Sequence, residues 1–182
     1  MPKNVSTTHN PYARLDVFTE DDNVNVIIET PKGSRNKFTF DEELGIFKLG
    51  GVLPAGAVFP FDFGFVPSTL GGDGDPLDVL LLMDEPAFAG CLVESRLIGV
   101  IEADQTEQGE TTRNDRLIAV AVDSRNHRDI TSLHQLSDNL VEEIEHFFIS
   151  YNEAKGKVFK PKGRYAAERA RQVVEEGIRK KE

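Results

Sequence analysis

Short apolar segments alternate with polar turns over the first two thirds of the chain, a pattern typical of β-strands. The first two strands, at 24–29 and 37–40, flank a turn at 31–34 and predict a hairpin. Further strands are predicted at 46–49, 79–83, 92–101 and 117–122. The charged segment 102–116 joins the last two as a hairpin tip.

The last third of the chain changes to a helical period. Apolar residues recur three, four and seven positions apart and so share one helix face: Leu140, Val141, Ile144, Phe147, Phe148 and Tyr151. Ser137 or Asp138 can cap the start of this helix, and Gly156 can end it. A second helix is predicted at about 165–180 by a similar stripe: Ala167, Ala170, Val173, Val174 and Ile178.

Strands followed by helices predict an α+β fold, in which a small closed OB-like β-barrel of about five strands carries two C-terminal helices packed outside. The polar residues 1–22 are interpreted as an N-terminal arm, and 23–182 as a single domain. The helix stripe at 137–152 can serve either the core or a contact between subunits.

The net charge and the length of the apolar stretches indicate which partners and which cellular location to expect. The chain has 182 residues and a net charge of −10, from 31 acidic and 21 basic residues, which disfavours nucleic acid or an anionic membrane as partner. Its longest apolar stretches are far too short to cross a bilayer, and its first residues lack the apolar segment of a signal peptide. We therefore expect a cytoplasmic protein.

Cysteine and histidine usage disfavours a zinc site. Cys91 is the single cysteine, so the chain can form no internal disulfide. The four histidines show neither HxH nor HExxH spacing. A metal bound here would depend on carboxylates.

Three such carboxylates, Asp73, Asp75 and Asp78, stand within six residues of the Gly- and Pro-rich loop 50–78. Like charges this close repel one another, and Mg²⁺ or a similar hard cation relieves the repulsion. An EF-hand fits poorly, because Pro76 interrupts the run and the sixth position is not glycine. Taken alone, the loop is more typical of an acidic surface turn than of a metal site.

The segment D-G-D-P-L-D-V resembles the signature of family I soluble inorganic pyrophosphatases. Further segments resemble this family in the same order, together spanning about residues 24–157: 26–31, then Lys37, 59–65, 99–101, 116–120 and 146–151. The resemblance implies hydrolysis of pyrophosphate to two phosphates, with several Mg²⁺ ions and Mn²⁺ as a possible substitute. It also implies a homo-oligomer.

The resemblance also implies roles for individual residues. Asp73 and Asp78 would bind metal, Asp75 would accept the proton of the attacking water, and Glu29 would hold a further metal. Lys37 and Tyr151 would contact phosphate. In the hairpin, Arg116 would contact substrate and Asp115 would bind metal, while Asp104 and Glu107 stay open as alternative ligands.

Several positions depart from the family pattern, mainly at donors to phosphate. Thr39 replaces an acid, Gly51 an arginine and Asn152 a lysine, while Asn114 falls in an altered hairpin motif. Phe59 and Phe63 replace tyrosines, and Asp62 replaces an asparagine.

Three hypotheses follow from this pattern. The first is an Mg²⁺-dependent inorganic pyrophosphatase. The second is a hydrolase of another phosphoanhydride or phosphoester, whose organic part replaces the missing contacts. The third is a non-catalytic metal-binding protein on the same scaffold. The intact Asp75 favours either enzyme.

Overall fold

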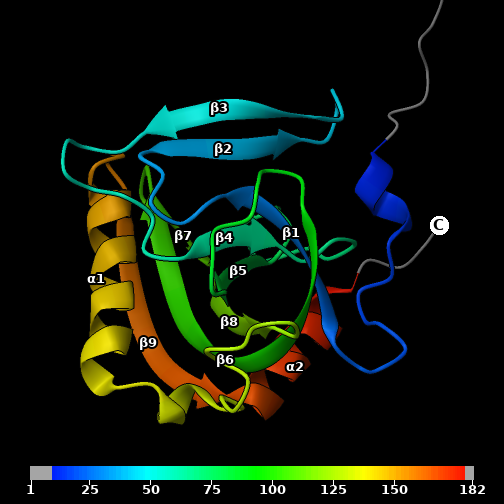
Figure 1. Ribbon diagram of the computed structural model, residues 1–182. Coiled ribbons are helices and arrows are strands. Elements are labelled where there is room, and N and C mark those ends of the chain that lie inside the picture. The colour runs from blue at the N-terminus through cyan, green and yellow to red at the C-terminus, as the bar shows by residue number, and fades with distance from the viewer. Residues whose placement is uncertain (1–9, 179–182) are drawn as a thin grey trace, which may run out of the picture.

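The computed structural model describes residues 10–178 and has a closed five-stranded barrel at its centre (Figure 1). The barrel strands, in the order in which they pair, are β1 (Val24–Thr30), β4 (Asp62–Phe65), β5 (Asp78–Leu82), β8 (Arg116–Ala121) and β6 (Leu92–Glu107). The ring closes because β1 pairs with both β4 and β6. All these pairings are antiparallel except that of β5 with β8. The predicted α+β barrel is confirmed.

On β5 and β8, side chains alternate between two hydrophobic clusters, as the two-residue period of a strand requires. On β5, Val79 and Leu81 belong to one cluster, and Leu80 and Leu82 to the other. The first cluster draws residues from β1, β5, β6 and β8, and therefore fills the barrel. The second lies between the barrel and the C-terminal helix α1 (Asp138–Glu153).

Four more strands lie outside the five-stranded ring. β2 (Asn36–Asp41) and β3 (Ile46–Val52) form a separate hairpin, which lies across the top of the barrel in Figure 1. β7 (Glu110–Arg113) and β9 (Val158–Ala166) both pair with β6. The long strand β6 thus joins the barrel to the C-terminal part of the chain.

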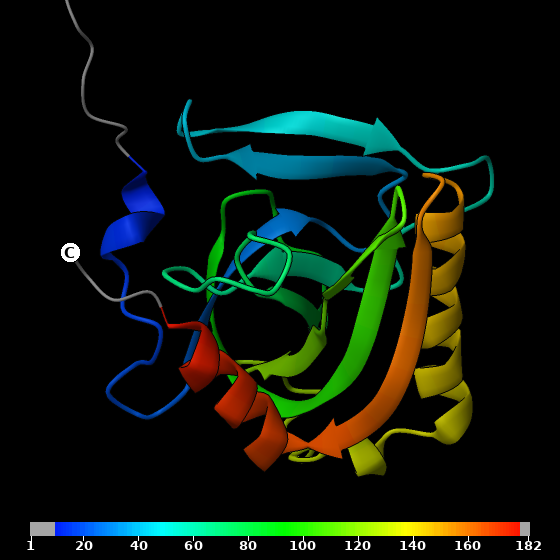
Figure 2. The same ribbon diagram turned by 180° about the vertical axis from the view of Figure 1, so that it is seen from behind.

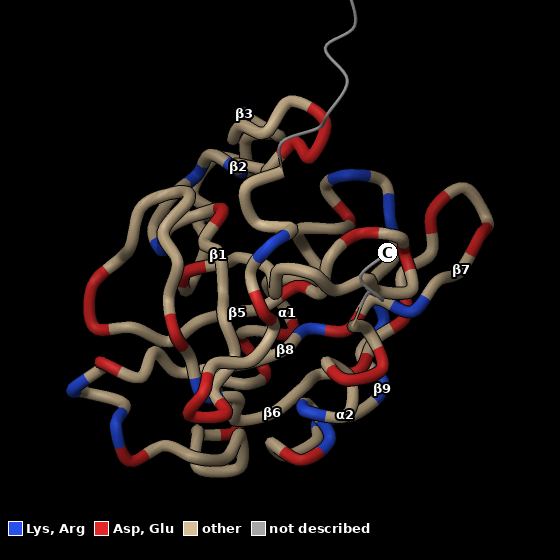
Figure 3. The backbone as a smooth tube through the Cα atoms, turned by 90° about the vertical axis from the view of Figure 1, so that its right-hand side faces the viewer, with Lys and Arg blue, Asp and Glu red and all other residues tan. Residues whose placement is uncertain are grey.

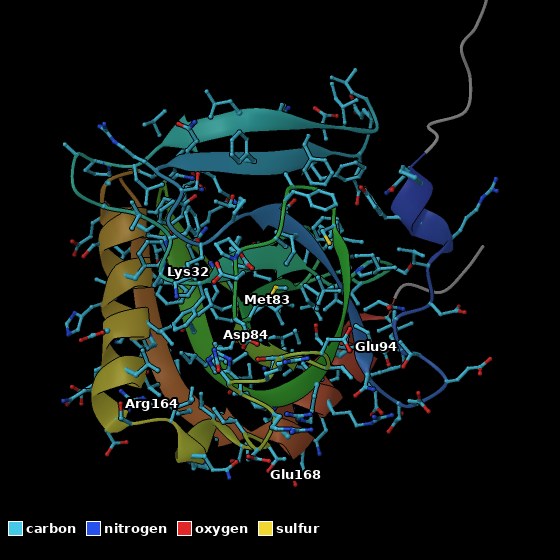
Figure 4. All side chains as sticks on the ribbon, in the orientation of Figure 1. Lys32, Met83, Asp84, Glu94, Arg164 and Glu168 are labelled. Carbon is cyan, nitrogen blue, oxygen red and sulfur yellow. The ribbon has the colours of Figure 1, made fainter. Side chains whose placement is uncertain are left out.

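Helix α1 begins where the sequence predicts, because the Ser137 hydroxyl accepts a hydrogen bond from the Leu140 N–H at 3.3 Å. Its apolar residues Val141, Ile144 and Phe148 are buried, so this stripe serves the core. Arg164 of β9 holds the helix in place by donating two hydrogen bonds to Glu145, at 2.9 and 2.8 Å (Figure 4).

The second helix, α2 (Ala167–Gly177), packs against β6 through Ala170, Val173 and Val174 and lies outside the barrel (Figure 2). Two short 3-10 helices complete the fold, η1 (Pro11–Arg14) and η2 (Leu133–Gln135).

The structure differs from the sequence predictions in several places. The predicted hairpin of 24–29 with 37–40 does not form, because β1 pairs with β4 and β6 while β2 pairs with β3, which runs on to Val52. β4 lies inside the segment predicted as a loop. The sequence does not indicate this strand, because it has only four residues and Gly and Pro are frequent around it. β9 was not predicted, and the second helix begins at Ala167 rather than at 165, because 165–166 belong to that strand. β6 continues to Glu107, so the hairpin tip is shorter than 102–116. Residues 179 and 180, the predicted end of the second helix, lie outside the described residues.

The described part of the predicted N-terminal arm contacts the barrel. Val17 is buried, and its carbonyl accepts a hydrogen bond from the Asn25 N–H at 3.0 Å. Acidic and basic positions are interspersed along loops and strands (Figure 3). Among residues 10–178, no helix combines the length and the apolar character that crossing a bilayer would take.

Candidate active site

One cleft of about 490 Å³ brings together seven of the eight site residues predicted from the sequence. It lies between the β2–β3 hairpin, the loop before β5, the β6–β8 edge and the C-terminal end of α1. The seven residues that line it are Glu29, Lys37, Asp73, Asp75, Asp78, Arg116 and Tyr151. Asp115 is the exception and lines a neighbouring recess instead.

Backbone hydrogen bonds fix the shape of the aspartate loop, 71–78. The Asp75 carbonyl accepts from the Gly71 N–H at 2.7 Å, and Gly74 takes a φ of 90°, which glycine adopts without steric cost. The Asp73 carboxylate accepts from the Asp75 N–H at 3.2 Å. Asp78 then begins strand β5. The loop therefore holds its three carboxylates along one wall of the cleft.

Burial and mutual repulsion raise the pKa of two of these carboxyl groups. The pKa of Asp75 is raised by desolvation first and then by the negative charges of Asp73 and Glu29. Desolvation raises the pKa of Asp78 to about 6, against the opposing effect of Arg116. Each carboxylate would be stabilised by a cation in the cleft.

Arg116 is almost fully buried and provides one such cation. Its Nη1 lies 2.7 Å from Oδ2 of Asp78 and also donates to the side chain of Asn114. The guanidinium lies over the rings of Phe148 and Phe159, at 4.9 and 5.1 Å from the ring centroids. Its Nε is buried without a hydrogen-bond partner.

Glu29 and Lys37 form a second buried ion pair, with Nζ 3.0 Å from Oε2. The other oxygen of Glu29 accepts from the Phe40 N–H at 2.8 Å, which ties β1 to β2. The ammonium of Lys37 lies 4.2 Å from the ring centroid of Phe63. A phenylalanine at this position thus contacts the lysine through its ring face, without a hydroxyl donor.

Tyr151 reaches the cleft from the last turn of α1 and stacks against Phe147, with ring centroids 5.9 Å apart. Phe59 meets its ring edge-on at 5.8 Å. Burial raises the pKa of the Tyr151 hydroxyl. The hydroxyl therefore stays protonated at neutral pH and can donate a hydrogen bond.

None of the three candidate hairpin carboxylates lines the cleft, and each is paired with a basic side chain. Asp104 binds Lys162 at 2.7 Å, Glu107 binds Lys157 at 2.8 Å, and Asp115 accepts from Arg113 at 2.6 Å and from the Ala103 N–H at 3.1 Å. The hairpin presents neutral amides to the cleft instead. Gln105 and Asn114 line it and share a hydrogen bond of 3.1 Å.

Lysines that the sequence did not assign to the site lie near the position of Asn152. Asn152 itself is buried, and its amide donates to the Phe148 carbonyl at 2.8 Å. Lys155 and Lys157 line the cleft from the turn between α1 and β9. Lys155 is one of the cations that the sequence places nearest to the site, together with Lys32 and Arg35, whereas the position of Lys157 depends on a strand that the hydrophobic pattern does not show.

Two other basic residues near the site in sequence do not line the cleft. Lys32 lies over the ring of Phe61, 5.4 Å from its centroid (Figure 4). Arg35 donates to the Leu53 carbonyl at 2.9 Å.

The donor set of the cleft suits a hard divalent cation. Carboxylates are its metal-binding groups, and no histidine or cysteine lines it. In residues 10–178 no three acidic, His or Cys side chains already converge on one point.

The fold and the cleft define an OB-like α+β protein whose site combines carboxylates for cations with basic residues for anions. The inorganic pyrophosphatase family model matches residues 26–182, and the chain belongs to this family.

Named relatives cover nearly the whole chain. An inorganic pyrophosphatase of Synechocystis sp. is 35% identical over 156 residues, covering 86% of this chain and 90% of that protein. One of Halalkalibacterium halodurans is 35% identical over 153 residues, covering 84% and 91%. The crystal structure of the Thermus thermophilus inorganic pyrophosphatase superposes with a TM-score of 0.83 at 34% identity, covering 92% of this chain and 96% of that one.

Proposed function

We propose that this protein hydrolyses inorganic pyrophosphate to two phosphates with the help of bound Mg²⁺, for which Mn²⁺ can substitute. The observation that carries the proposal is the meeting, in one cleft, of four carboxylates with the cations of Lys37 and Arg116. Pyrophosphate is a small polyanion, so its binding requires positive charge. Family membership supports the same substrate.

The carboxylates of Asp73, Asp78 and Glu29 would hold the ions. When bound, the cation supplies charge neutralisation and activates water for attack. Asp78 and Glu29 already pair with Arg116 and Lys37, so the same carboxylates position the two basic side chains beside the ions. Asp115 does not line the cleft, so we leave it out of this ligand set.

Asp75 would accept the proton of the attacking water. The water oxygen bonds to one phosphorus as the bridging P–O bond breaks, and the proton leaves to the Asp75 carboxylate. Desolvation and neighbouring negative charge raise the pKa of Asp75, which makes it a stronger base than an exposed aspartate. Lys37, Arg116 and Tyr151 would donate to phosphate oxygens as negative charge is redistributed.

The second candidate is a hydrolase of a larger phosphoanhydride. Its support is the loss of hydroxyl donors: Phe59 and Phe63 line the cleft where the family pattern has tyrosines, so contacts from the organic part of a substrate would have to replace them. Thr39 and the amides of Gln105 and Asn114 line the cleft where the family pattern has acids, so carboxylates are missing at these positions.

A phosphate-release assay distinguishes these functions. Pyrophosphate, nucleoside triphosphates and a phosphomonoester are each incubated with the protein, with Mg²⁺ and with a chelator. We expect Mg²⁺-dependent release that is fastest from pyrophosphate. Faster release from a nucleotide would favour the second candidate, and no release from any substrate would favour a non-catalytic protein.

A further inference from the structure

Lys155 lies where the cleft opens at the end of α1. Its ammonium donates a short hydrogen bond to the Tyr151 hydroxyl oxygen and lies 4.3 Å from the ring centroid of that tyrosine. Tyr151 stands in the last turn of the helix and Lys155 in the turn that follows it, and the hydrogen bond holds the two side chains together. The contact positions Lys155 over the cleft although its side chain is long and flexible.

Lys155 forms no direct ion pair with a described carboxylate, although the charges of Asp78 and Glu107 act on it from farther away. None of the ion pairs between the described residues includes it, whereas Lys157, two residues on, pairs with Glu107 at 2.8 Å. Desolvation and then the positive charge of Lys157 lower the pKa of Lys155. Two ammonium groups at one edge of a cleft are unfavourable unless an anion binds between or beside them.

The hydrogen bond also orients Tyr151. A lysine ammonium can only donate, so the phenolic oxygen accepts from it and the phenolic O–H is left to donate elsewhere. Burial keeps that O–H protonated. Lys155 and Tyr151 together therefore present two kinds of donor to the same space.

We infer that Lys155 is a substrate-binding residue, which contacts a phosphate group directly and turns the Tyr151 hydroxyl toward the same group. The assignment rests on the proposed function only for the identity of the anion. The phosphate contact itself requires no metal ion, because both donors belong to the protein. Metal-free anion binding is therefore its most direct measure.

The test compares Lys155→Met with Lys160→Met, which removes the same charge from an exposed lysine of β9 outside the cleft. Pyrophosphate binding is measured by calorimetry in a chelator, where hydrolysis does not interfere. We expect Lys155→Met to weaken binding about tenfold and Lys160→Met to leave it unchanged, since one charge-assisted contact is lost. Lys155→Arg, which keeps the charge, should bind nearly as tightly as the parent protein.

In the presence of Mg²⁺, Lys155→Met should raise KM more than it lowers kcat, because the contact already exists before reaction. Equal chelator binding by the parent, Lys155→Met and Lys160→Met would overturn the assignment, as would equal losses in the two Met variants. If the parent binds pyrophosphate through Lys155 but does not hydrolyse it, the proposed function fails and the assignment stands.

Discussion

Nη1 of Arg116 lies 2.7 Å from Oδ2 of Asp78, so a buried cation already occupies one side of a carboxylate that we propose as a metal ligand. The side chain of Asp78 is 22% exposed and that of Arg116 only 4%. Removing the arginine would leave a largely buried charge without its partner. A metal ion bound at Asp78 would therefore act on the same carboxylate as Arg116.

This relationship predicts that Mg²⁺ rescues Arg116→Met. The variant should lose about 2–3 kcal/mol of unfolding free energy without metal, toward the low end for a broken buried pair because Asp78 is partly exposed. Millimolar Mg²⁺ should then raise its melting temperature more than that of the parent protein, because the ion replaces the missing cation. Thermal melts with and without Mg²⁺ measure both effects.

Arg113→Met is the matched control, because Arg113 pairs with Asp115 and Glu102 outside the main cleft. It should show the same Mg²⁺ shift as the parent protein. An equal shift in both variants would mean that Mg²⁺ does not bind at Asp78.

The second prediction concerns the base. Asp75→Asn keeps the size of the side chain and removes its basicity, so turnover should fall by roughly 10² or more. The Mg²⁺-induced rise in melting temperature should persist, since Asp73 and Asp78 remain. Asp41→Asn, at the rim of the same cleft, should change turnover far less. Near-parental turnover in Asp75→Asn would exclude the assigned role.

The third prediction concerns acid stability. The Asp84 carboxylate accepts from the Ser124 hydroxyl at 2.7 Å and from the N–H groups of Arg125 and Asn126, at 2.8 and 3.1 Å (Figure 4). These bonds, that of Ser124 first, lower the pKa of Asp84 to about 2. A pKa below the value of about 3.9 for an unfolded chain means that the charged form favours folding.

The stabilisation from Asp84 should be complete above about pH 4 and disappear as the pH falls toward 2. Asp84→Asn should melt at a lower temperature than the parent protein at pH 7, and the difference should narrow over that acid range. The exposed Asp123→Asn controls for loss of one charge. A difference that stays constant down to pH 2 would contradict the assignment of the pKa.

The sequence predicts the aspartate wall of the cleft well because one short loop carries all three residues. Asp73, Asp75 and Asp78 need no knowledge of distant contacts, and strand β5 fixes where the loop ends. The sequence predicts the barrel equally well, since its longer strands appear as clear apolar runs. The four-residue strand β4 is not, because it is too short to show a period.

The sequence could not predict which hairpin residues form the opposite wall of the cleft. Along β6, Gln105 faces the cleft while Asp104 pairs with Lys162, and only the strand register decides which of the two neighbours faces inward. Asn114 and Asp115 differ similarly. From the sequence alone, the hairpin carboxylates are therefore predicted as metal ligands, whereas in the structure the neighbouring amides line the cleft.

The fourth prediction concerns two departures from the family pattern, Gly51 and Asn152. The two positions differ in whether a basic side chain can replace the present residue without loss of stability. Asn152 is 2% exposed, and its amide satisfies the Phe148 carbonyl at 2.8 Å. Asn152→Lys should therefore cost about 1–3 kcal/mol of unfolding free energy, since it buries a charge and removes that side-chain hydrogen bond. Chemical denaturation measures the loss.

Gly51 is free to change, because its φ is not positive and no atom lies within 4 Å of an added Cβ. It pairs with Lys37 across the hairpin, so its side chain would share the face that Lys37 presents to the cleft. Gly51→Arg should fold normally and raise kcat/KM for pyrophosphate by roughly tenfold. Gly51→Gln, with similar length and no charge, should give little gain. If the Arg and Gln variants behave alike, positive charge at this edge of the cleft does not limit the reaction, and Lys155 and Arg116 already supply enough of it.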